Sequence, residues 1–387
     1  MRLFGCLVFF NFGLIGFFVS PIVVAQGSID AETLQRMKEL KEKYQLPSVS
    51  VAVGLVEEIV FAEAIGFSDI EKNRPATRET QYSVGSLAKP MTGIALARLM
   101  DSGQVDLQAP VSKYVKQPEY TQQFSVRELA AHIAGVPHNT AERHTAEFVD
   151  IKDHISPFDA FYVFDSHPLL FPPGTDYEYS SNGYILLSAV IESAADMNYV
   201  NFLQSSLWDE LGMKSTELDT FLAGREHEAS YYQAIKPDGN FAISPVNRDR
   251  SFLFGGGGFI STPSDLIRLS RATFPEDFLS DDARLAMATP ARLRNGEINS
   301  DRYSLGWRVA AIRLTEDAKE EWLALHHGGV TDKASTAYLL VVPECKASIA
   351  FATNYIPEKF WRMRGDMAKV LKGYINQEQC RRSFKAS

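Results

Sequence analysis

Strand-like segments occur at both ends of this chain of 387 residues, and the long stretch between them has the pattern of helices and loops. Runs rich in β-branched and aromatic residues indicate strands at 48–56, 59–66, 303–314, 321–327, 335–342 and 347–354. Strands from both ends need partners, so they are expected to meet in one antiparallel sheet that helices cover. The pattern therefore predicts the α+β class, with a mostly helical domain inserted into a sheet domain.

The expected domain limits follow from this pattern and from the length of the chain. A chain of this size exceeds one typical hydrophobic core, so two domains are expected after an N-terminal segment, residues 1–25. Residues 26–103 and 301–380 are assigned to the α/β sheet domain, and residues 104–300 to the helical domain. Helices are expected at 31–44, 184–195 and 358–375, and between Ser86 and Gly103.

The N-terminal segment is typical of a secretory signal peptide. Arg2 is its only charge, and an uncharged run from Leu3 ends at Ala25 in a sequence of the A-x-A type. An uncleaved membrane anchor is the alternative, because a run of this length also suffices to span a bilayer. The chain is therefore expected to be secreted or periplasmic, and to contact a membrane only if this segment is retained.

Net charge bears on which partners the chain can bind, and cysteine content bears on the disulfides it can form. The formal net charge of −9 argues against nucleic acid as a partner. Cys345 and Cys380 are the two cysteines after the N-terminal segment, and in an exported chain they either pair or remain two thiols. The sequence does not give their distance, so both states stay open.

The sequence Ser86-Leu87-Ala88-Lys89 is an S-x-x-K motif at the start of a predicted helix. Residues i and i+3 share a helix face, so the Lys89 amine is expected within reach of the Ser86 hydroxyl. A serine hydroxyl becomes a good nucleophile when a nearby base takes its proton, and a desolvated lysine with a lowered pKa is such a base. The same motif also occurs at ordinary helix starts, where the serine caps the helix and the lysine is solvated.

A second candidate segment, Tyr179-Ser180-Ser181, opens a predicted helix directly after a Pro-Pro-Gly turn. A tyrosine beside a lysine is expected to have a lowered phenol pKa, which suits a general acid or base. The alternative is a tyrosine that only packs at a helix start. Asn182 is expected on the other side of that start, away from the lysine.

A third candidate segment, Leu325-His326-His327-Gly328-Gly329, lies at the end of a predicted edge strand. A strand beside a serine nucleophile can offer a backbone N–H to the oxyanion that forms during acyl transfer. The two glycines would let a substrate backbone approach closely. Adjacent residues of a strand point to opposite faces, and no third ligand follows at a metal-binding spacing, so no metal site is predicted.

In this order, the three segments resemble the motifs S-x-x-K, Y-x-[NST] and [KH]-[TG]-G of the serine β-lactamase and penicillin-binding-protein superfamily. The resemblance is closest to its class C β-lactamase-like branch, which holds peptidase S12-like D-Ala-D-Ala carboxypeptidases, esterases and mitochondrial β-lactamase-like serine proteases. Similar runs occur at 46–53, 124–135, 173–174, 257–262 and 305–307. The resemblance implies a β-lactamase/transpeptidase-like fold.

The resemblance also implies a role for each matching residue. Ser86 would be the acylated nucleophile, and Lys89 and Tyr179 would share proton transfer, with the base for acylation left open between them. The backbone N–H groups of Ser86 and Gly329 would form the oxyanion hole. The substrate-binding residues would be Ser181, His326, His327 and Gly328.

Two of these positions differ from the residues that particular groups of the superfamily carry. Ser181 stands where many members have asparagine, and a hydroxyl cannot supply both the donor and the acceptor that an amide side chain offers. His326 replaces the lysine of true class C β-lactamases, and an imidazole holds a substrate carboxylate less firmly than an ammonium does.

The chain is therefore expected to be an exported serine hydrolase that forms an acyl-enzyme on Ser86 and cleaves small amides, short peptides or esters. A D-alanyl peptidase and an esterase are the two expected types. One alternative is a true class C-like β-lactamase, and another is a non-catalytic binding or sensing domain with this fold. No cofactor is expected, the partner is a small-molecule or short-peptide substrate, and the natural substrate and the oligomeric state stay open.

Overall fold

The computed structural model describes residues 21–138, 156–164, 167–220, 225–236, 239–244, 249–274, 278–313, 319–375 and 380. Most of the expected signal segment lies outside these residues. Helix α1 (Pro21–Lys43) begins before residue 31, where the sequence pattern placed its start. Within the part of the chain that the structure describes, no helix is both long and apolar enough to cross a membrane.

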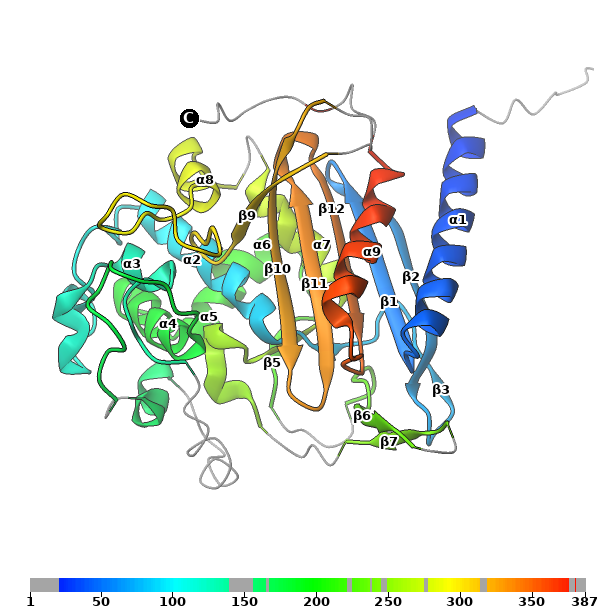
Figure 1. Ribbon diagram of the computed structural model, residues 1–387, viewed down its shortest axis with the longest axis horizontal. Helices are drawn as coiled ribbons and strands as arrows, with labels where there is room; N and C mark the ends of the chain where they lie inside the picture. The colour runs from blue at the N-terminus through cyan, green and yellow to red at the C-terminus, as the bar shows by residue number, and fades with distance from the viewer. Residues whose placement is uncertain are drawn as a thin grey trace, which may run out of the picture.

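The main sheet has seven antiparallel strands in the order β3-β2-β1-β12-β11-β10-β9 (Figure 1). Their bounds are β1 (Ser48–Leu55), β2 (Glu58–Asp69), β3 (Arg74–Pro75), β9 (Arg308–Ile312), β10 (Trp322–Thr331), β11 (Ser335–Val342) and β12 (Ala347–Thr353). The two ends of the chain meet at the centre, where Ser50 of β1 lies opposite Ala352 of β12. This arrangement confirms the predicted α+β class, with one sheet built from both ends of the chain.

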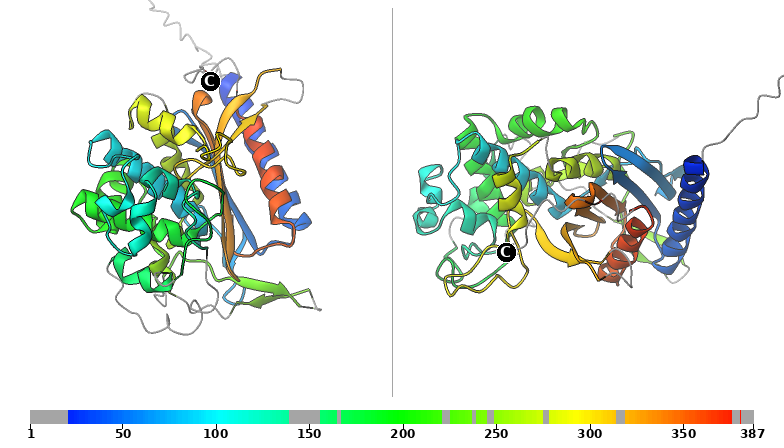
Figure 2. Two further views of the ribbon diagram at one scale, coloured as in Figure 1. Left: turned by 60° about the vertical axis from the view of Figure 1, so that its left-hand side comes forward. Right: turned by 90° about the horizontal axis from the view of Figure 1, so that it is seen from above.

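Helices cover both faces of this sheet. Helix α1 and helix α9 (Phe360–Lys372) pack on one face, around buried side chains that include Met37, Met363 and Met367. Helix α7 (Pro263–Ser270) packs on the other face against β1 and β12. Figure 2 shows the two terminal helices on one side of the sheet and the remaining helices on the opposite side. The limits expected for the two domains stay a prediction, and α7 brings part of the middle segment onto the sheet.

The middle of the chain supplies most of the other helices and two small sheets. The helices are α2 (Ala88–Asp101), α3 (Val126–Ala130), α4 (Ser181–Ala195), α5 (Tyr199–Leu203), α6 (Asp209–Leu211) and α8 (Asp281–Ala288). The small sheets pair β4 (Tyr82–Ser83) and β5 (Glu217–Leu218) with β8 (Phe259–Ser261), and β6 (Tyr232–Ile235) with β7 (Phe241–Ile243). Helices α2 and α4 are buried around almost their whole circumference, as expected for the interior of a helical layer.

Strand β10 is longer than the sequence pattern indicated. It runs on to Thr331, whereas its neighbour β9 pairs with it only from Trp322 to His326. Beyond that point one edge of β10 pairs with β11, and the other edge lies against the short turn Gly85–Leu87 that precedes α2. The segment Leu325–Gly329 is therefore inside a strand, and the free edge of that strand faces the S-x-x-K segment at Ser86.

Cys345 and Cys380 form a disulfide. Cys345 lies in the short turn that precedes β12, and Cys380 lies beyond α9. The bond therefore ties the C-terminal end of the chain to the sheet, which resolves the pairing that the sequence left open.

Candidate active site

Ser86 and Lys89 lie at the junction between the turn Gly85–Leu87 and helix α2. The turn needs glycine at position 85, because its φ is +50° and a Cβ there would lie 2.8 Å from the Val330 carbonyl oxygen. Lys89 is the second residue of α2, and Pro90 follows it in the first turn, where a missing N–H costs nothing. The predicted spacing of the S-x-x-K motif therefore brings the two side chains together.

The Lys89 amine is buried and is held by three uncharged oxygens. Its Nζ lies 3.2 Å from Ser86 Oγ, 3.1 Å from Ser181 Oγ and 2.6 Å from the Gly256 carbonyl oxygen. Burial, and after it the positive charge of Arg308, holds the pKa of Lys89 well below its usual value of 10.5. Burial of this kind favours the neutral amine, which is the form that can accept the proton of Ser86.

Tyr179 completes the group around the nucleophile. Its hydroxyl forms a hydrogen bond with Ser86, and its ring centroid lies 4.7 Å from Lys89 Nζ. Burial raises the pKa of Tyr179 to about 12, and the hydrogen bond from Ser86 and the charge of Arg308 offset this only in part. The expectation of a lowered phenol pKa is therefore wrong, because loss of solvent outweighs the nearby cations.

Two histidines hold the start of helix α4, which carries Ser181. The backbone N–H groups of Ser180 and Ser181 donate to Nδ1 of His132 at 3.1 Å and to Nδ1 of His138 at 3.0 Å. Nδ1 of His132 therefore carries no proton, and burial followed by the Lys89 charge keeps its pKa well below 6.5. Neither histidine belongs to the three candidate segments of the sequence, and only their position in space links them to the site.

Ser181 and Asn182 point in different directions, as expected. Ser181 accepts from Lys89, whereas the Asn182 amide is buried and donates to the carbonyl oxygen of Pro137 at 3.1 Å. The glycine loop Gly255–Gly258 closes the far side of Lys89, and a Cβ at Gly256 would lie 2.6 Å from the Ser181 carbonyl oxygen. The loop is therefore a close-packed turn that supplies one acceptor to Lys89, a contact that no sequence motif indicated.

The two adjacent histidines of β10 lie on opposite faces of the sheet. His327 is buried beside the ring of Tyr179, with centroids 6.2 Å apart. His326 lies on the α9 face, 5.9 Å from the ring of Tyr338, and burial lowers its pKa to about 4. The structure therefore corrects the expected substrate-binding role of His326, because strand alternation turns this side chain away from Ser86. Of the two histidines, His327 is the one on the face of Ser86 and Tyr179.

The tautomer of His327 follows from its partners. Its Nδ1 lies 2.9 Å from the Gly328 carbonyl oxygen, which can only accept, so Nδ1 carries the proton. Its Nε2 then accepts from Arg308 Nη1 at 3.3 Å and lies 2.9 Å from the Tyr303 hydroxyl. Burial and the Arg308 charge keep the pKa of His327 well below 6.5. The positive charge on this side of the site therefore belongs to Arg308, which also pairs with Asp301 at 2.9 Å.

The free edge of β10 offers one backbone donor to Ser86. The Gly329 carbonyl accepts from Thr336 Oγ1 at 2.9 Å, on the β11 side, whereas the Val330 carbonyl points toward Gly85. The N–H and C=O of one strand residue point to the same edge. The N–H that faces the turn of Ser86 is therefore that of Val330, and the expected role of the Gly329 N–H is corrected.

Gly328 and Gly329 leave room on opposite faces of β10. A Cβ at Gly329 would overlap the carbonyl oxygen of Val84, so glycine is needed for the strand to approach the nucleophile turn. A Cβ at Gly328 would overlap the guanidinium of Arg364 in α9. Gly328 therefore does not face the substrate side, where it was expected, and its missing side chain accommodates an arginine.

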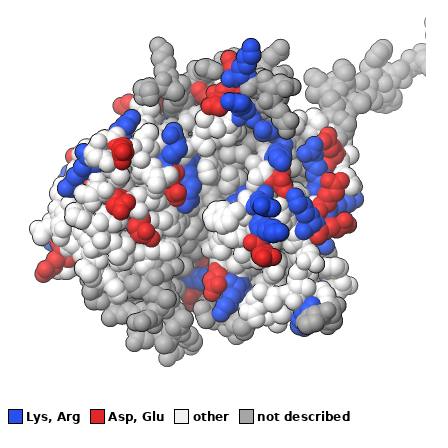
Figure 3. Space-filling view, in the orientation of Figure 1, with Lys and Arg blue, Asp and Glu red and all other residues white. Residues whose placement is uncertain are grey.

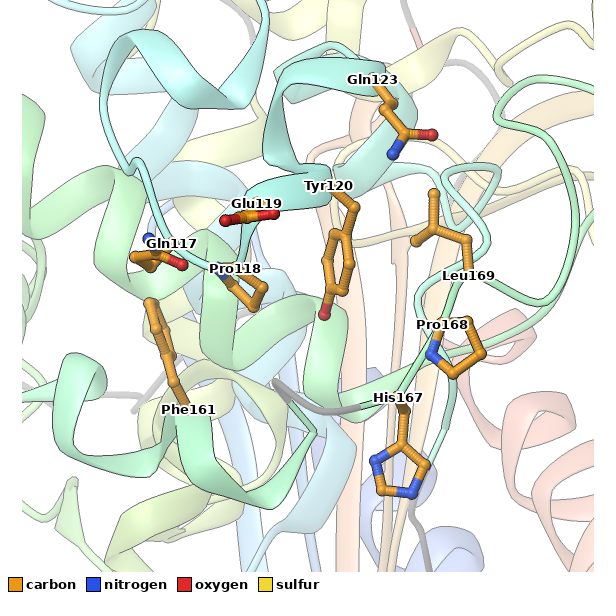
Figure 4. A pocket seen from close by; sticks show the side chains of 9 residues that line it. All are labelled: Gln117, Pro118, Glu119, Tyr120, Gln123, Phe161, His167, Pro168 and Leu169. Carbon is orange, nitrogen blue, oxygen red and sulfur yellow. The ribbon is translucent and has the colours of Figure 1, made fainter.

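Other cavities lie apart from these residues. Figure 4 shows one in the helical layer, lined by Gln117, Pro118, Glu119, Tyr120, Gln123, Phe161, His167, Pro168 and Leu169. None of its lining residues belongs to the group around Ser86. Among the residues that the structure describes, no cluster of histidine, cysteine and carboxylate side chains could hold a metal ion.

Comparisons with known proteins show the family of this chain. The chain is 24% identical to a mitochondrial serine beta-lactamase-like protein of Homo sapiens, over 80% of this chain and 71% of that one. It is 24% identical to a penicillin-binding protein of Bacillus subtilis, over 80% of this chain and 68% of that one. The fold matches a D-amino acid amidase of Ochrobactrum anthropi with a TM-score of 0.70 and 22% identity, over 92% of this chain and 99% of that one. The model of the beta-lactamase family matches residues 34–368. The chain belongs to the beta-lactamase family of serine hydrolases.

Proposed function

We propose that this chain hydrolyses small amides, short peptides or esters through an acyl-enzyme on Ser86. The observation that supports this most strongly is the buried Lys89 amine, 3.2 Å from Ser86 Oγ and held only by uncharged oxygens. Ser86 Oγ attacks the substrate carbonyl, and its proton passes to the neutral amine. The leaving amine or alcohol takes up that proton, and water then releases the acid from Ser86 by the reverse path.

The acylation base is assigned to Lys89 and not to Tyr179. Burial favours the neutral form of both groups. Neutral lysine is a base, whereas neutral tyrosine is an acid. A lysine with a strongly lowered pKa is ready to accept a proton, whereas a tyrosine with a pKa of about 12 is ready to donate one. Tyr179 is therefore assigned to a relay: it donates its own proton to the leaving group and is reprotonated by the proton that Lys89 took from Ser86.

The N–H groups of Ser86 and Val330 form the proposed oxyanion hole. Both lie where the free edge of β10 meets the turn before α2, and neither needs a side chain to act. Preorganised donors of this kind stabilise the charge that develops on the carbonyl oxygen in the transition state.

A carboxylate close to the scissile bond is the proposed feature of a preferred substrate, which favours the D-alanyl peptidase type over the simple esterase. Arg308 carries a positive charge beside the rings of Tyr179 and Tyr303, at 5.2 and 5.4 Å. His327 is neutral and its lone pair is already engaged by Arg308, so the imidazole has no charge to offer. A related fold is that of a protein described as a D-amino acid amidase, which also supports an amide substrate.

Export remains part of the proposal. The Cys345–Cys380 disulfide supports an oxidising compartment, because structural disulfides are rare where thiols are kept reduced.

The test is the intact mass of the protein after incubation with a fluorophosphonate, penicillin G or p-nitrophenyl acetate, with Ser86→Ala beside each. An adduct on the parent and none on the variant supports the acyl-enzyme. A long-lived penicilloyl adduct points to a peptidase, and rapid ester turnover without that adduct points to an esterase. Fast hydrolysis of nitrocefin would point to a β-lactamase instead. No adduct with any probe would overturn the proposal in favour of a non-catalytic domain.

A further inference from the structure

Arg364 is a buried cation on the side of β10 that faces away from the nucleophile. It lies in α9 with only 6% of its surface exposed, and Gly328 makes room for its guanidinium. Aromatic rings surround it: its Cζ lies 4.2 Å from the ring centroid of Trp361, 5.0 Å from that of Phe360 and 5.8 Å from that of Tyr338. None of these contacts supplies a negative charge, so packing alone does not explain a buried guanidinium here.

The hydrogen bonds of Arg364 are directed at one peptide group of the site. Its Nη2 lies 3.3 Å from the Gly329 carbonyl oxygen and 3.5 Å from Thr336 Oγ1. Thr336 Oγ1 itself donates to the Gly329 carbonyl oxygen at 2.9 Å. A charged donor and a hydroxyl therefore converge on the same acceptor.

That carbonyl belongs to the same peptide group as the Val330 N–H. The peptide unit is planar and trans, so its C=O and N–H point in opposite directions, and resonance couples them. Donors on the oxygen draw electron density from the nitrogen, and hydrogen bonds in a chain strengthen one another in a medium of low dielectric. A donor that carries a charge has a larger effect than a neutral one.

We propose that Arg364 is a positioning residue that fixes and polarises the Gly329–Val330 peptide, so that the Val330 N–H binds the oxyanion more strongly. The inference rests on the proposed function, because it acts only if Ser86 forms an acyl-enzyme. Arg364 contacts neither the nucleophile nor the substrate side of β10. It acts through the strand from the α9 layer, which places one component of the site on the opposite side of the sheet from Ser86.

The chain offers a matched control on the same helix. Lys and Arg side chains gather on the surface over α9 (Figure 3), and Arg362 is exposed in that helix only two residues before Arg364. Arg362→Met removes the same charge from α9 without touching the Gly329 carbonyl. Arg364→Met keeps an unbranched side chain under the aromatic rings but removes the charge and the donor. Arg364→Lys keeps the charge.

The experiment measures kcat and KM for p-nitrophenyl acetate, together with the infrared carbonyl frequency of the acyl-enzyme. Arg364→Met is expected to lower kcat about tenfold, less than the loss of a whole oxyanion donor, with KM changed less than about twofold. Its acyl carbonyl frequency is expected to rise, because the carbonyl is less polarised. Arg364→Lys is expected to keep most of the rate, and Arg362→Met all of it.

Different results separate the inference from the proposed function. If the parent forms no adduct that depends on Ser86, the proposed function fails. If the parent acylates normally and Arg364→Met has the parental kcat and carbonyl frequency, the role of Arg364 is overturned. Should Arg364→Met fail to fold, Thr336→Val takes its place: a higher carbonyl frequency supports the inference, and an unchanged frequency contradicts it.

Discussion

Two buried basic side chains lie on opposite sides of the proposed acylation site, and burial has a different consequence for the charge of each. Lys89 stands behind Ser86 in the helical layer, and Arg364 stands behind Gly329 in the α9 layer. Both donate to uncharged oxygens and both lose solvent. Burial lowers the pKa of the amine well below 10.5, and it lowers the pKa of the guanidinium from 12.5 to about 10, so that Arg364 stays charged near pH 7. Similar burial therefore favours a neutral base on one side and leaves a cation at neutral pH on the other.

The largest expected effect comes from Lys89→Arg, which places a guanidinium like that of Arg364 behind Ser86. A guanidinium does not release its proton near pH 7, so acylation of Ser86 is expected to fall about 10³-fold or more. Burst kinetics with p-nitrophenyl acetate measure this rate. Lys89→Met is the matched variant without charge, and it is expected to be equally slow. Substantial activity in Lys89→Arg would show that another group is the base.

Tyr179→Phe is expected to have the next largest effect. Loss of a positioned proton donor typically costs about 10²-fold in rate, and the cost should be greater for amides, whose leaving group needs a proton, than for activated esters. The measurement is kcat/KM for a matched amide and ester. An equal loss for both substrates would contradict the assignment of Tyr179 to the leaving group.

The dependence of kcat/KM on pH distinguishes the two candidate bases. Activity requires the neutral amine of Lys89, so it should rise as pH passes upward through its lowered pKa, well below 10.5. A tyrosinate base would instead place this limb near the Tyr179 pKa of about 12. A limb that close to 12 in the parent would exclude Lys89 as the base.

Arg308→Met is expected to have a small effect on the pH dependence of kcat/KM and a larger effect on substrate specificity. The Arg308 charge is the second cause of the lowered Lys89 pKa, so its removal should move the limb to higher pH. It should also reduce the preference for a substrate that bears a carboxylate over its amide about tenfold, as expected for one charged contact. Arg302→Met, a variant of a neighbouring arginine, serves as the control. An unchanged preference would argue against Arg308 as the carboxylate contact.

The smallest expected effect is on stability. Between the lowered pKa of Lys89 and its unfolded value near 10.5, the unfolded chain binds the additional proton, so the stability contributed by this group rises with pH. The difference in free energy of unfolding between the parent and Lys89→Met should therefore change in favour of the parent from pH 7 to pH 9.5. Parallel curves for the two proteins would mean that Lys89 titrates normally in the fold.

The sequence by itself determined the sheet built from both ends, the helix behind Ser86 and the pairing of Ser86 with Lys89. Periodicity and i, i+3 spacing are local properties, so they can be read without knowing the rest of the fold. It also indicated that His326 and His327 point to opposite faces of a strand. It could not tell which of them faces the nucleophile, because that depends on which layer covers each face.

Only the tertiary structure decided the electrostatics of the site. The pKa directions of Lys89 and Tyr179 follow from burial, and burial is produced by segments far away in the chain, such as the loop at Gly256. Arg364 reaches Gly329 across a sheet whose order no local pattern specifies, and the Val330 N–H became the candidate donor only through the strand's register. Chemistry-bearing residue types were visible in the sequence, whereas their direction, solvation and partners depend on long-range packing.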